Sequence, residues 1–192
     1  GPVGESGAVD CAAFCRTPDM TPRLLIIGCG DVGLRVLKLL AGRWRVYALT
    51  SSPARAAALR DAGALPLVGN LDDPATLSRL AGLADLVLHL APPQAHGATD
   101  ARSRHLLAAL GRRPPAVLVY ASTTGVYGDC RGAFIDETRR LQPATDRARR
   151  RVDAEACLRA FGRRHGTRVS LLRIPGIYAR DREGGHPRER LL

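Results

Sequence analysis

The segment at residues 28–33, GCGDVG, has the residue types and the spacing that suit binding of a pyrophosphate. It directly follows the aliphatic run LLII and precedes LRVLKLL, which has the apolar periodicity of a helix. Gly28 would allow a tight turn, Gly30 would let a pyrophosphate approach the backbone, and Gly33 would let helix and strand pack closely. Free N–H groups and the dipole at the start of a helix attract phosphate. The sequence therefore predicts a dinucleotide site, with a plain strand-to-helix turn as the alternative. The contacts predicted in this segment are Gly28, Gly30, Asp31, Val32 and Gly33.

The residues after the second expected strand indicate which dinucleotide is bound. A site for NAD usually places Asp or Glu about 20 residues after the first glycine, where the carboxylate accepts from the ribose 2′-hydroxyl. Residues 48–52 read ALTSS, without a carboxylate, and Arg55 follows. Hydroxyl groups and a guanidinium suit a 2′-phosphate, so Ser51 and Arg55 are predicted to contact NADP, with NAD as the alternative cofactor. For Arg55 itself the alternative is an ordinary solvated position on a helix.

Strands and helices in strict alternation are expected to position these segments. Aliphatic runs predict six strands, at residues 23–28, 45–50, 64–71, 85–91, 116–122 and 168–174. Helices are predicted after the glycine turn as far as Gly42, then at 54–63, from Pro74, at 99–110 and at about 144–162. This alternation predicts an α/β fold: a Rossmann doubly wound parallel sheet of at least six strands with helices on both faces.

The 192 residues are enough for one domain with a sizeable core. We expect an NAD(P)-binding domain at 22–180, a loose extension at 1–21 and a loosely ordered tail at 181–192. No apolar run approaches the roughly 18 to 20 residues of a membrane span, and the amino-terminal segment does not resemble a secretory signal. Five cysteines without a repeated close pair argue against a metal site and indicate reduced thiols in a cytoplasm.

The net charge of +11 raises the question of a nucleic-acid partner. Nearly all of the positive charge is arginine, aromatic residues make up only 4 %, and no stretch interleaves rings with basic residues as a stacking platform requires. A solvated basic surface is therefore the simpler interpretation. Nucleic-acid binding is kept as a third functional alternative.

Five ordered motifs extend the interpretation beyond the glycine turn. They are GCGDVG, GNLDD at 69–73, HLAPP at 89–93, YASTTGVYG at 120–128 and LRIPGIY at 172–178. Through them the chain from Arg23 to Ala179 resembles the extended and atypical short-chain dehydrogenase/reductases, specifically their NAD(P)-binding epimerase/dehydratase-like group. The resemblance implies an oxidoreductase or a nucleotide-sugar epimerase or dehydratase, acting on a small molecule such as a nucleotide sugar or a carbonyl compound. Helices beside the fifth strand often pair subunits in this family, which leaves a homodimer open.

The same resemblance implies roles for single residues along the motifs. Ser122 and Thr123 would end the fifth strand facing the nicotinamide, and Thr123 would take the place of the family's catalytic serine or threonine. The alternative is that these two hydroxyls satisfy backbone groups of the loop. The further cofactor contacts that the resemblance implies, from the adenine to the nicotinamide, are Asn70, Leu71, Leu90, Ala91, Pro92 and Pro175.

The sequence departs from this family at its acid/base pair, Tyr-x-x-x-Lys, which normally follows a proline. After Pro143 the two positions hold Arg147 and Arg151, whose i, i+4 spacing puts both on one helix face. A guanidinium stays protonated at neutral pH, so Arg147 cannot replace the tyrosine as an acid. Two such arginines bind anions, either phosphates of the cofactor or a carboxylate of a substrate, and Arg151 is predicted to contact the cofactor. A solvated basic face flanked by Asp146 and Asp153 is the alternative. The apolar stripe expected beside them consists of Ala148, Val152, Ala156 and Ala160.

No other residue replaces the acid convincingly. Tyr127, in the VYG turn, is more typical of a packing residue, and Tyr178 and Asp146 are weaker candidates. The sequence also ends shortly after the sixth expected strand, so the lobe that binds substrate in this family is expected to be absent. These two departures support a second functional hypothesis, a non-catalytic dinucleotide-binding sensor or regulatory module.

Overall fold

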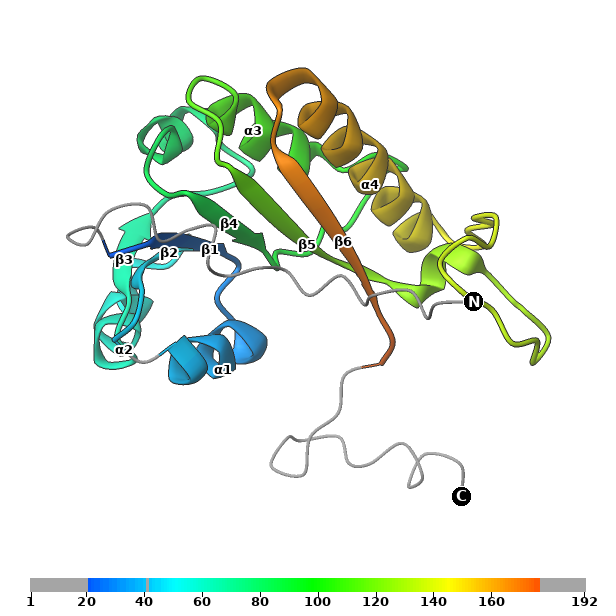
Figure 1. Ribbon diagram of the computed structural model, residues 1–192, viewed down its shortest axis with the longest axis horizontal. Helices are drawn as coiled ribbons and strands as arrows, with labels where there is room; N and C mark the ends of the chain where they lie inside the picture. Colours follow the sequence, from blue (N-terminus) through cyan, green and yellow to red (C-terminus); the bar gives the residue numbers. More distant parts are fainter. Residues whose placement is uncertain (1–20, 41, 177–192) are drawn as a thin grey trace, which may run out of the picture.

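A six-stranded parallel sheet forms the centre of the computed structural model, which describes residues 21–40 and 42–176 (Figure 1). Its strand order is β3-β2-β1-β4-β5-β6, and every neighbouring pair is parallel. The strands are β1 (Arg23–Ile27), β2 (Arg45–Thr50), β3 (Leu65–Val68), β4 (Leu86–His89), β5 (Val117–Thr123) and β6 (Arg168–Ile174). The predicted Rossmann doubly wound α/β fold is confirmed.

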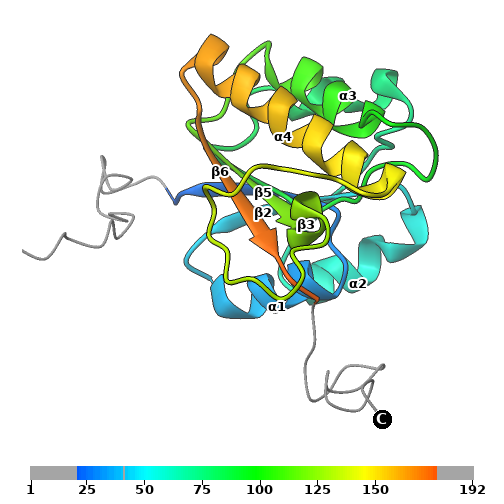
Figure 2. The ribbon, with the colours of Figure 1, turned by 90° about the vertical axis from the view of Figure 1, so that its right-hand side faces the viewer.

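Helices cover both faces of this sheet. Figures 1 and 2 show α1 and α2 on one face and α3 and α4 on the other. Their bounds are α1 (Asp31–Leu40), α2 (Ala56–Asp61), α3 (Ala101–Leu110) and α4 (Asp146–His165). Three short 3₁₀ helices complete the described elements: η2 (Pro53–Arg55), η3 (Pro74–Leu80) and η4 (Thr124–Tyr127).

The aliphatic run of β1 packs against the helices on both faces of the sheet. Leu24 and Ile26 belong to the core cluster shared with α1 and α2, whereas Leu25 and Ile27 belong to the cluster shared with α3 and α4. All four side chains are buried. Successive side chains of a strand point to opposite faces, so a strand covered on both sides must be apolar at every position.

The strand order reverses at β1, and this reversal positions the candidate site. Ile27, the last residue of β1, pairs with Leu49 of β2 on one side and with His89 of β4 on the other. The chain therefore leaves β1 toward one half of the sheet and returns to start the other half at β4. In open parallel sheets, ligands bind at the carboxyl edge of such a switch point.

Several element bounds differ from those expected. The segment from Pro74 forms a 3₁₀ helix, capped by the Asp73 carboxylate that accepts from the Ala75 N–H, rather than an α-helix. The helix expected at 54–63 is divided between η2 and α2, and the strand expected at 64–71 is reduced to β3. Pro53 and Pro74 each lie at the first position of a 3₁₀ helix, where proline is favoured because its missing N–H would be unpaired in any case. Helices this short often keep the i to i+3 hydrogen bonds of a 3₁₀ helix instead of the i to i+4 bonds of an α-helix.

The face that α4 buries also differs from the expectation. Ala156 and Ala160, expected in an apolar stripe, are exposed, while Leu158 and Phe161 are buried. Alanine buries little area, so the larger side chains decide which face of the helix packs on the sheet. The predicted stripe is therefore wrong at Ala156 and Ala160, whereas Ala148 is buried as expected and Val152 is half-buried.

Within the described residues, no helix combines the length and apolarity that crossing a membrane requires. The tail expected at 181–192 and nearly all of the extension expected at 1–21 lie outside the described residues, as does Tyr178.

Candidate functional site

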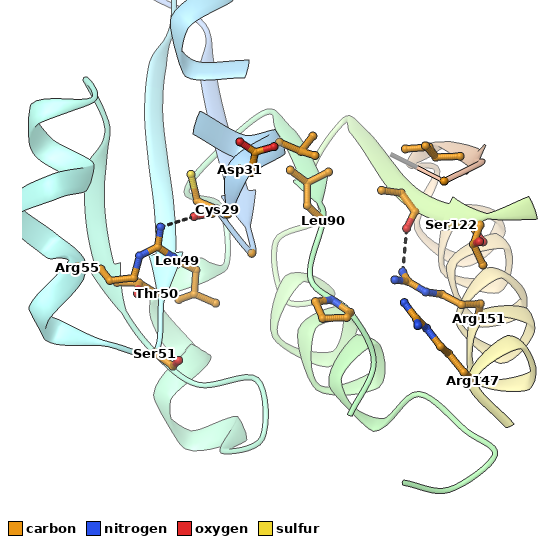
Figure 3. Close-up of a pocket in the computed structure, with 18 of the residues that line it drawn as sticks. Cys29, Asp31, Leu49, Thr50, Ser51, Arg55, Leu90, Ser122, Arg147 and Arg151 are labelled. Carbon is orange, nitrogen blue, oxygen red and sulfur yellow. Dashed lines mark hydrogen bonds between the residues drawn. The ribbon is translucent and has the colours of Figure 1, made fainter. Parts of the chain in front are cut away.

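A cavity of about 650 Å³ lies at the carboxyl edge of the sheet (Figure 3). Its walls come from the glycine turn after β1, the end of β2, the loop after β4, the end of β5, the start of α4 and the residues after β6. This is the switch point identified above, and the volume is within the range of small-molecule sites, roughly 300 to 1,000 Å³. The fold thus brings segments that are far apart in the sequence around one space.

The three glycines of the turn have different surroundings. Gly28 has φ +80°, and a Cβ there would lie 2.6 Å from the backbone nitrogen of Ala91, so this position requires glycine. At Gly33 a Cβ would lie 2.8 Å from the sulfur of Cys29, because α1 packs closely on the turn. At Gly30 a Cβ would meet no described atom within 4 Å. Gly30 therefore borders open space, at the point where α1 begins and where its N–H groups favour an anion.

One end of the cavity is formed by the end of β2 and by Arg55. The Arg55 guanidinium donates from Nη2 to the carbonyl of Cys29 at 2.9 Å, so it lies over the glycine turn (Figure 3). Thr50, Ser51 and Ser52 line the same end with hydroxyl groups. Burial raises the pKa of the Cys29 thiol, against the opposing effect of the Arg55 charge. This end offers hydroxyls and one cation, without a carboxylate from β2.

The opposite end of the cavity carries Thr123 and Ser122 at the end of β5. Thr123 Oγ1 accepts from the N–H of Gly125 at 3.2 Å and caps η4, and within the described residues its own hydrogen has no acceptor. Ser122 instead donates its hydrogen to the carboxylate of Glu155, at 2.7 Å. Thr123 can therefore donate to a ligand, while Ser122 is engaged with the protein.

Glu155 is the centre of a buried ionic network behind this wall. Its carboxylate is fully buried and accepts from Arg173 Nε at 3.1 Å and Nη2 at 2.8 Å. Burial opposes its ionisation, but hydrogen bonds from Arg173 and Ser122 hold the pKa of the carboxyl below its ordinary value. Arg173 also donates to the hydroxyl of Tyr127 at 2.8 Å. The network ties α4, β5 and β6 together at the edge that forms the cavity.

Arg151 and Arg147 line the cavity from α4, one turn apart (Figure 3). Arg151 donates from Nη1 to the hydroxyl of Tyr120 and to the carbonyl of Ala121, both at 2.9 Å. Its guanidinium carbon also lies 5.6 Å from the centre of the Tyr120 ring. Arg151 is therefore held in place by β5, whereas Arg147 is exposed.

The tyrosines in the described part of the chain do not offer an acid to the cavity. Tyr127 is buried and packs against Arg173, as expected of a packing residue. Tyr120 is buried as well, and desolvation raises its pKa to about 12 despite the nearby charge of Arg151. None of the described tyrosines, Tyr47 included, lines the cavity. Asp146 lies at the start of α4 and pairs with Arg149 at 2.6 Å.

Most of the predicted site residues are brought together. Those that line the cavity are Gly28, Gly30, Asp31, Val32, Ser51, Arg55, Leu90, Pro92, Ser122, Thr123, Arg151 and Pro175. Their contacts with a cofactor stay predictions.

Four predicted residues are not on the cavity wall. Gly33 and Ala91 pack against the turn from behind, as the short Cβ distances show. The Leu71 side chain is buried in the core, and Asn70 is exposed, with its Oδ1 accepting from the Asp72 N–H. Any cofactor contact of Asn70 or Leu71 would lie outside the lining of this cavity, and it also stays a prediction.

Sequence reasoning did not select several other lining residues. Leu49, Thr50 and Ser52 flank the predicted Ser51. Their place at the carboxyl end of an expected buried strand could have identified them, because ligands bind at that edge of a parallel sheet. Ile174 and Gly176 flank Pro175 in the same way. Within the described residues, no group of three or more metal-ligating side chains is found.

A family model described as the NAD dependent epimerase/dehydratase family matches residues 24–192. Among proteins of curated function, no match to the sequence is found. Among solved structures, a candidate epimerase from Burkholderia cenocepacia J2315 is 23% identical with a TM-score of 0.71, over 89% of this chain and 59% of that one. A functionally unknown conserved protein from Silicibacter pomeroyi DSS is 30% identical with a TM-score of 0.67, over 82% of this chain and 55% of that one.

UDP-glucuronic acid 4-epimerase from Bacillus cereus, solved in complex with UDP-glucuronic acid and NAD, is 19% identical. Its TM-score is 0.65, over 79% of this chain and 55% of that one. The chain thus spans little more than half the length of these three structures.

Proposed function

Because the chain belongs to the NAD dependent epimerase/dehydratase family, we propose that it binds NADP in the cavity and acts as an oxidoreductase or epimerase/dehydratase on a small molecule. The observation that carries this proposal is the open space at Gly30, bordered by the start of α1. A dinucleotide needs its pyrophosphate to reach backbone N–H groups without obstruction by side chains. Gly30 meets this requirement at the carboxyl edge of the central strand.

The preference for NADP over NAD rests on Arg55. The guanidinium reaches the glycine turn, and the hydroxyls of Ser51 and Ser52 line the cavity beside it. A cation with several donors suits a 2′-phosphate, whereas the carboxylate that typically accepts from a 2′-hydroxyl has no counterpart in residues 48–52. NAD is the alternative cofactor, and it is the one bound in the Bacillus cereus structure.

A bound nicotinamide would supply hydride transfer. The residues of this chain would orient the reactants: Thr123 donates a hydrogen bond to the reacting oxygen, and Arg151 holds the cofactor from α4. Arg151 suits this role because Tyr120 and the carbonyl of Ala121 fix its position. Leu90 lies between these residues and the glycine turn (Figure 3), and Pro92 lines the same cavity. We propose a nucleotide sugar or a carbonyl compound as the substrate class, in line with the UDP-glucuronic acid bound in the Bacillus cereus structure.

A second function is favoured by one observation. Arg147 lies where the family places its tyrosine, and the two buried tyrosines near the cavity are engaged with Arg151 and Arg173. A cavity to which no described tyrosine offers a proton suits a dinucleotide-binding sensor that does not turn over substrate. The free thiols of Cys29, Cys130 and Cys157 support a cytoplasmic location for either function.

Titration with NADPH and NADH tests the proposal. The wild-type chain is expected to bind NADPH more tightly, and Gly30→Val is expected to abolish binding because the valine side chain fills the space for the pyrophosphate. Since a Cβ at Gly30 touches no described atom, this variant should fold normally, as circular dichroism and thermal unfolding would show. Ala160→Val, at an exposed position of α4 outside the cavity, is the control for general effects of an added valine side chain. Unchanged NADPH affinity in Gly30→Val would refute the site. NADPH binding without consumption of any nucleotide sugar or carbonyl compound would favour the sensor.

A further inference from the structure

A second cavity, of about 470 Å³, adjoins the first at the start of α4. Its lining includes Gly125 within η4, Gly128 directly after η4, and Thr145 directly before α4. It shares Thr123, Arg147 and Arg151 with the larger cavity. A molecule in the second cavity would therefore lie against the same hydroxyl that is proposed to face the nicotinamide.

The second cavity has positive charge and no lining carboxylate. The carboxylates that α4 carries are paired elsewhere within the described residues: Asp146 with Arg149, Asp153 with Arg104, and Glu155 with Arg173. In the larger cavity the lining carboxylate is Asp31, which lies across the cavity from α4 and contacts Arg35 (Figure 3). The charge at the junction of the two cavities is thus not neutralised by the described residues.

Arg147 is the guanidinium available to a ligand at this junction. Arg151 already donates to Tyr120 and Ala121, whereas no hydrogen bond or ion pair joins Arg147 to residues 21–40 or 42–176. Figure 3 shows both guanidinium groups directed from α4 into the cavity. Two cations one helical turn apart repel each other, and an oxyanion between them would relieve this repulsion.

The position of Arg147 separates it from the expected phosphates of the cofactor. The pyrophosphate is proposed at Gly30 and a 2′-phosphate at Arg55, both on the side of β1 and β2. Arg147 lies on α4, at the opposite side of the cavity from Arg55 and beyond Leu90 (Figure 3). An anion at Arg147 would thus belong to a different molecule from the dinucleotide.

We propose that Arg147 binds an oxyanion of the substrate, a carboxylate or a phosphate, at the junction of the two cavities. This inference rests on the proposed function and gives it a substrate class: a small molecule whose anionic group lies close to the carbon that reacts beside Thr123. At this position the family's tyrosine would act as a general acid. The guanidinium of Arg147 instead binds an oxyanion through two parallel hydrogen bonds.

The test compares Arg147→Gln with Arg163→Gln, an exposed arginine on the same helix that has no partner among the described residues. Malonate represents a carboxylate ligand and inorganic phosphate a phosphate ligand. Each is titrated by calorimetry into the wild-type chain and both variants, with and without saturating NADP. Arg147→Gln is expected to weaken binding of at least one probe about tenfold, the scale of one charge-assisted hydrogen bond, while Arg163→Gln binds as wild type does. The dissociation constant of NADP itself should be the same in all three proteins.

Three results would overturn the inference: binding of neither probe by the wild type, equal binding of both probes by the two variants, or loss of NADP affinity in Arg147→Gln. The third would assign Arg147 to the cofactor. Failure of the proposed function is distinguishable, because NADP would then not bind to the wild type while the probes still distinguish the two variants. The probe whose binding is weakened more by Arg147→Gln identifies the substrate oxyanion as carboxylate or phosphate.

Discussion

The hydroxyl of Ser122 donates to the buried carboxylate of Glu155 at 2.7 Å, across the contact between β5 and α4. The same carboxylate binds Arg173 of β6, so one ionised group joins three elements directly behind the candidate site. A buried carboxylate is tolerated only where its oxygens are satisfied by donors. The hydroxyl hydrogen of the neighbouring Thr123, by contrast, has no acceptor among the described residues. Two adjacent hydroxyl groups of one motif thus differ in whether the protein itself engages them.

Ser122→Ala is expected to lower the free energy of unfolding by about 1 to 3 kcal/mol, because it removes a donor from a buried charged acceptor. Urea unfolding, followed by circular dichroism, measures this change. Ser170→Ala on β6 is the control, since Ser170 has no hydrogen-bond partner among the described residues and is only half-buried. Equal destabilisation by the two substitutions would contradict the role assigned to Ser122.

Thr123→Ala is expected to leave folding and NADPH affinity nearly unchanged and to lower kcat about a hundredfold, as loss of a donor to a reacting oxygen does. The measurement is consumption of NADPH in the presence of a substrate found among carbonyl compounds and nucleotide sugars. Thr124→Ala, at the next and exposed position, is the control. Full turnover by Thr123→Ala would remove this residue from the mechanism.

Arg55→Asp is expected to change the cofactor preference from NADP toward NAD. A carboxylate repels the 2′-phosphate and can accept from a 2′-hydroxyl, so the ratio of the two dissociation constants should change by about a hundredfold. Fluorescence titration with NADPH and NADH measures this ratio. Arg60→Asp, an exposed position on α2, controls for the change in net charge. A ratio that stays the same in both variants would place Arg55 outside the cofactor contact.

His89 predicts a loss of stability in acid. It is fully buried at the end of β4, and its Nε2 lies 2.8 Å from Ser103 Oγ, which itself donates to Asp100. Burial, helped by the charge of Arg151, lowers the pKa of His89 from 6.5 to about 3. The unfolded chain therefore binds a proton at this residue that the folded chain does not bind, and the free energy of unfolding should fall as the pH decreases from about 6.5 toward 3.

Urea unfolding of the wild type and His89→Gln at a series of pH values tests this prediction. The glutamine variant is less stable at neutral pH but should lose less stability over the same range, because it lacks the titrating group. Parallel pH profiles for the two proteins would show that His89 does not contribute.

The sequence alone was sufficient for the order of the elements and for the type of fold. Runs such as LLII at 24–27 must be buried on both faces, and the alternation of such runs with helical segments permits few arrangements other than a parallel sheet. Two of the glycines in the turn have a steric reason within a few residues, namely the positive φ of Gly28 and the close packing of Gly33 on Cys29, whereas Gly30 borders open space. Lengths of short elements were less predictable, since the 3₁₀ helix at Pro74–Leu80 and an α-helix share the same starting signals.

The tertiary structure decided which of the candidate side chains are free to act. The sequence places Ser122 next to Thr123 and Arg147 one turn before Arg151, with the same chemical groups in each pair. Their availability depends on partners distant in the chain: Glu155 for Ser122, and Tyr120 with Ala121 for Arg151. Local patterns carry strand and helix periodicity, but the engagement of a donor depends on long-range contacts that only the folded sheet and its helices bring together.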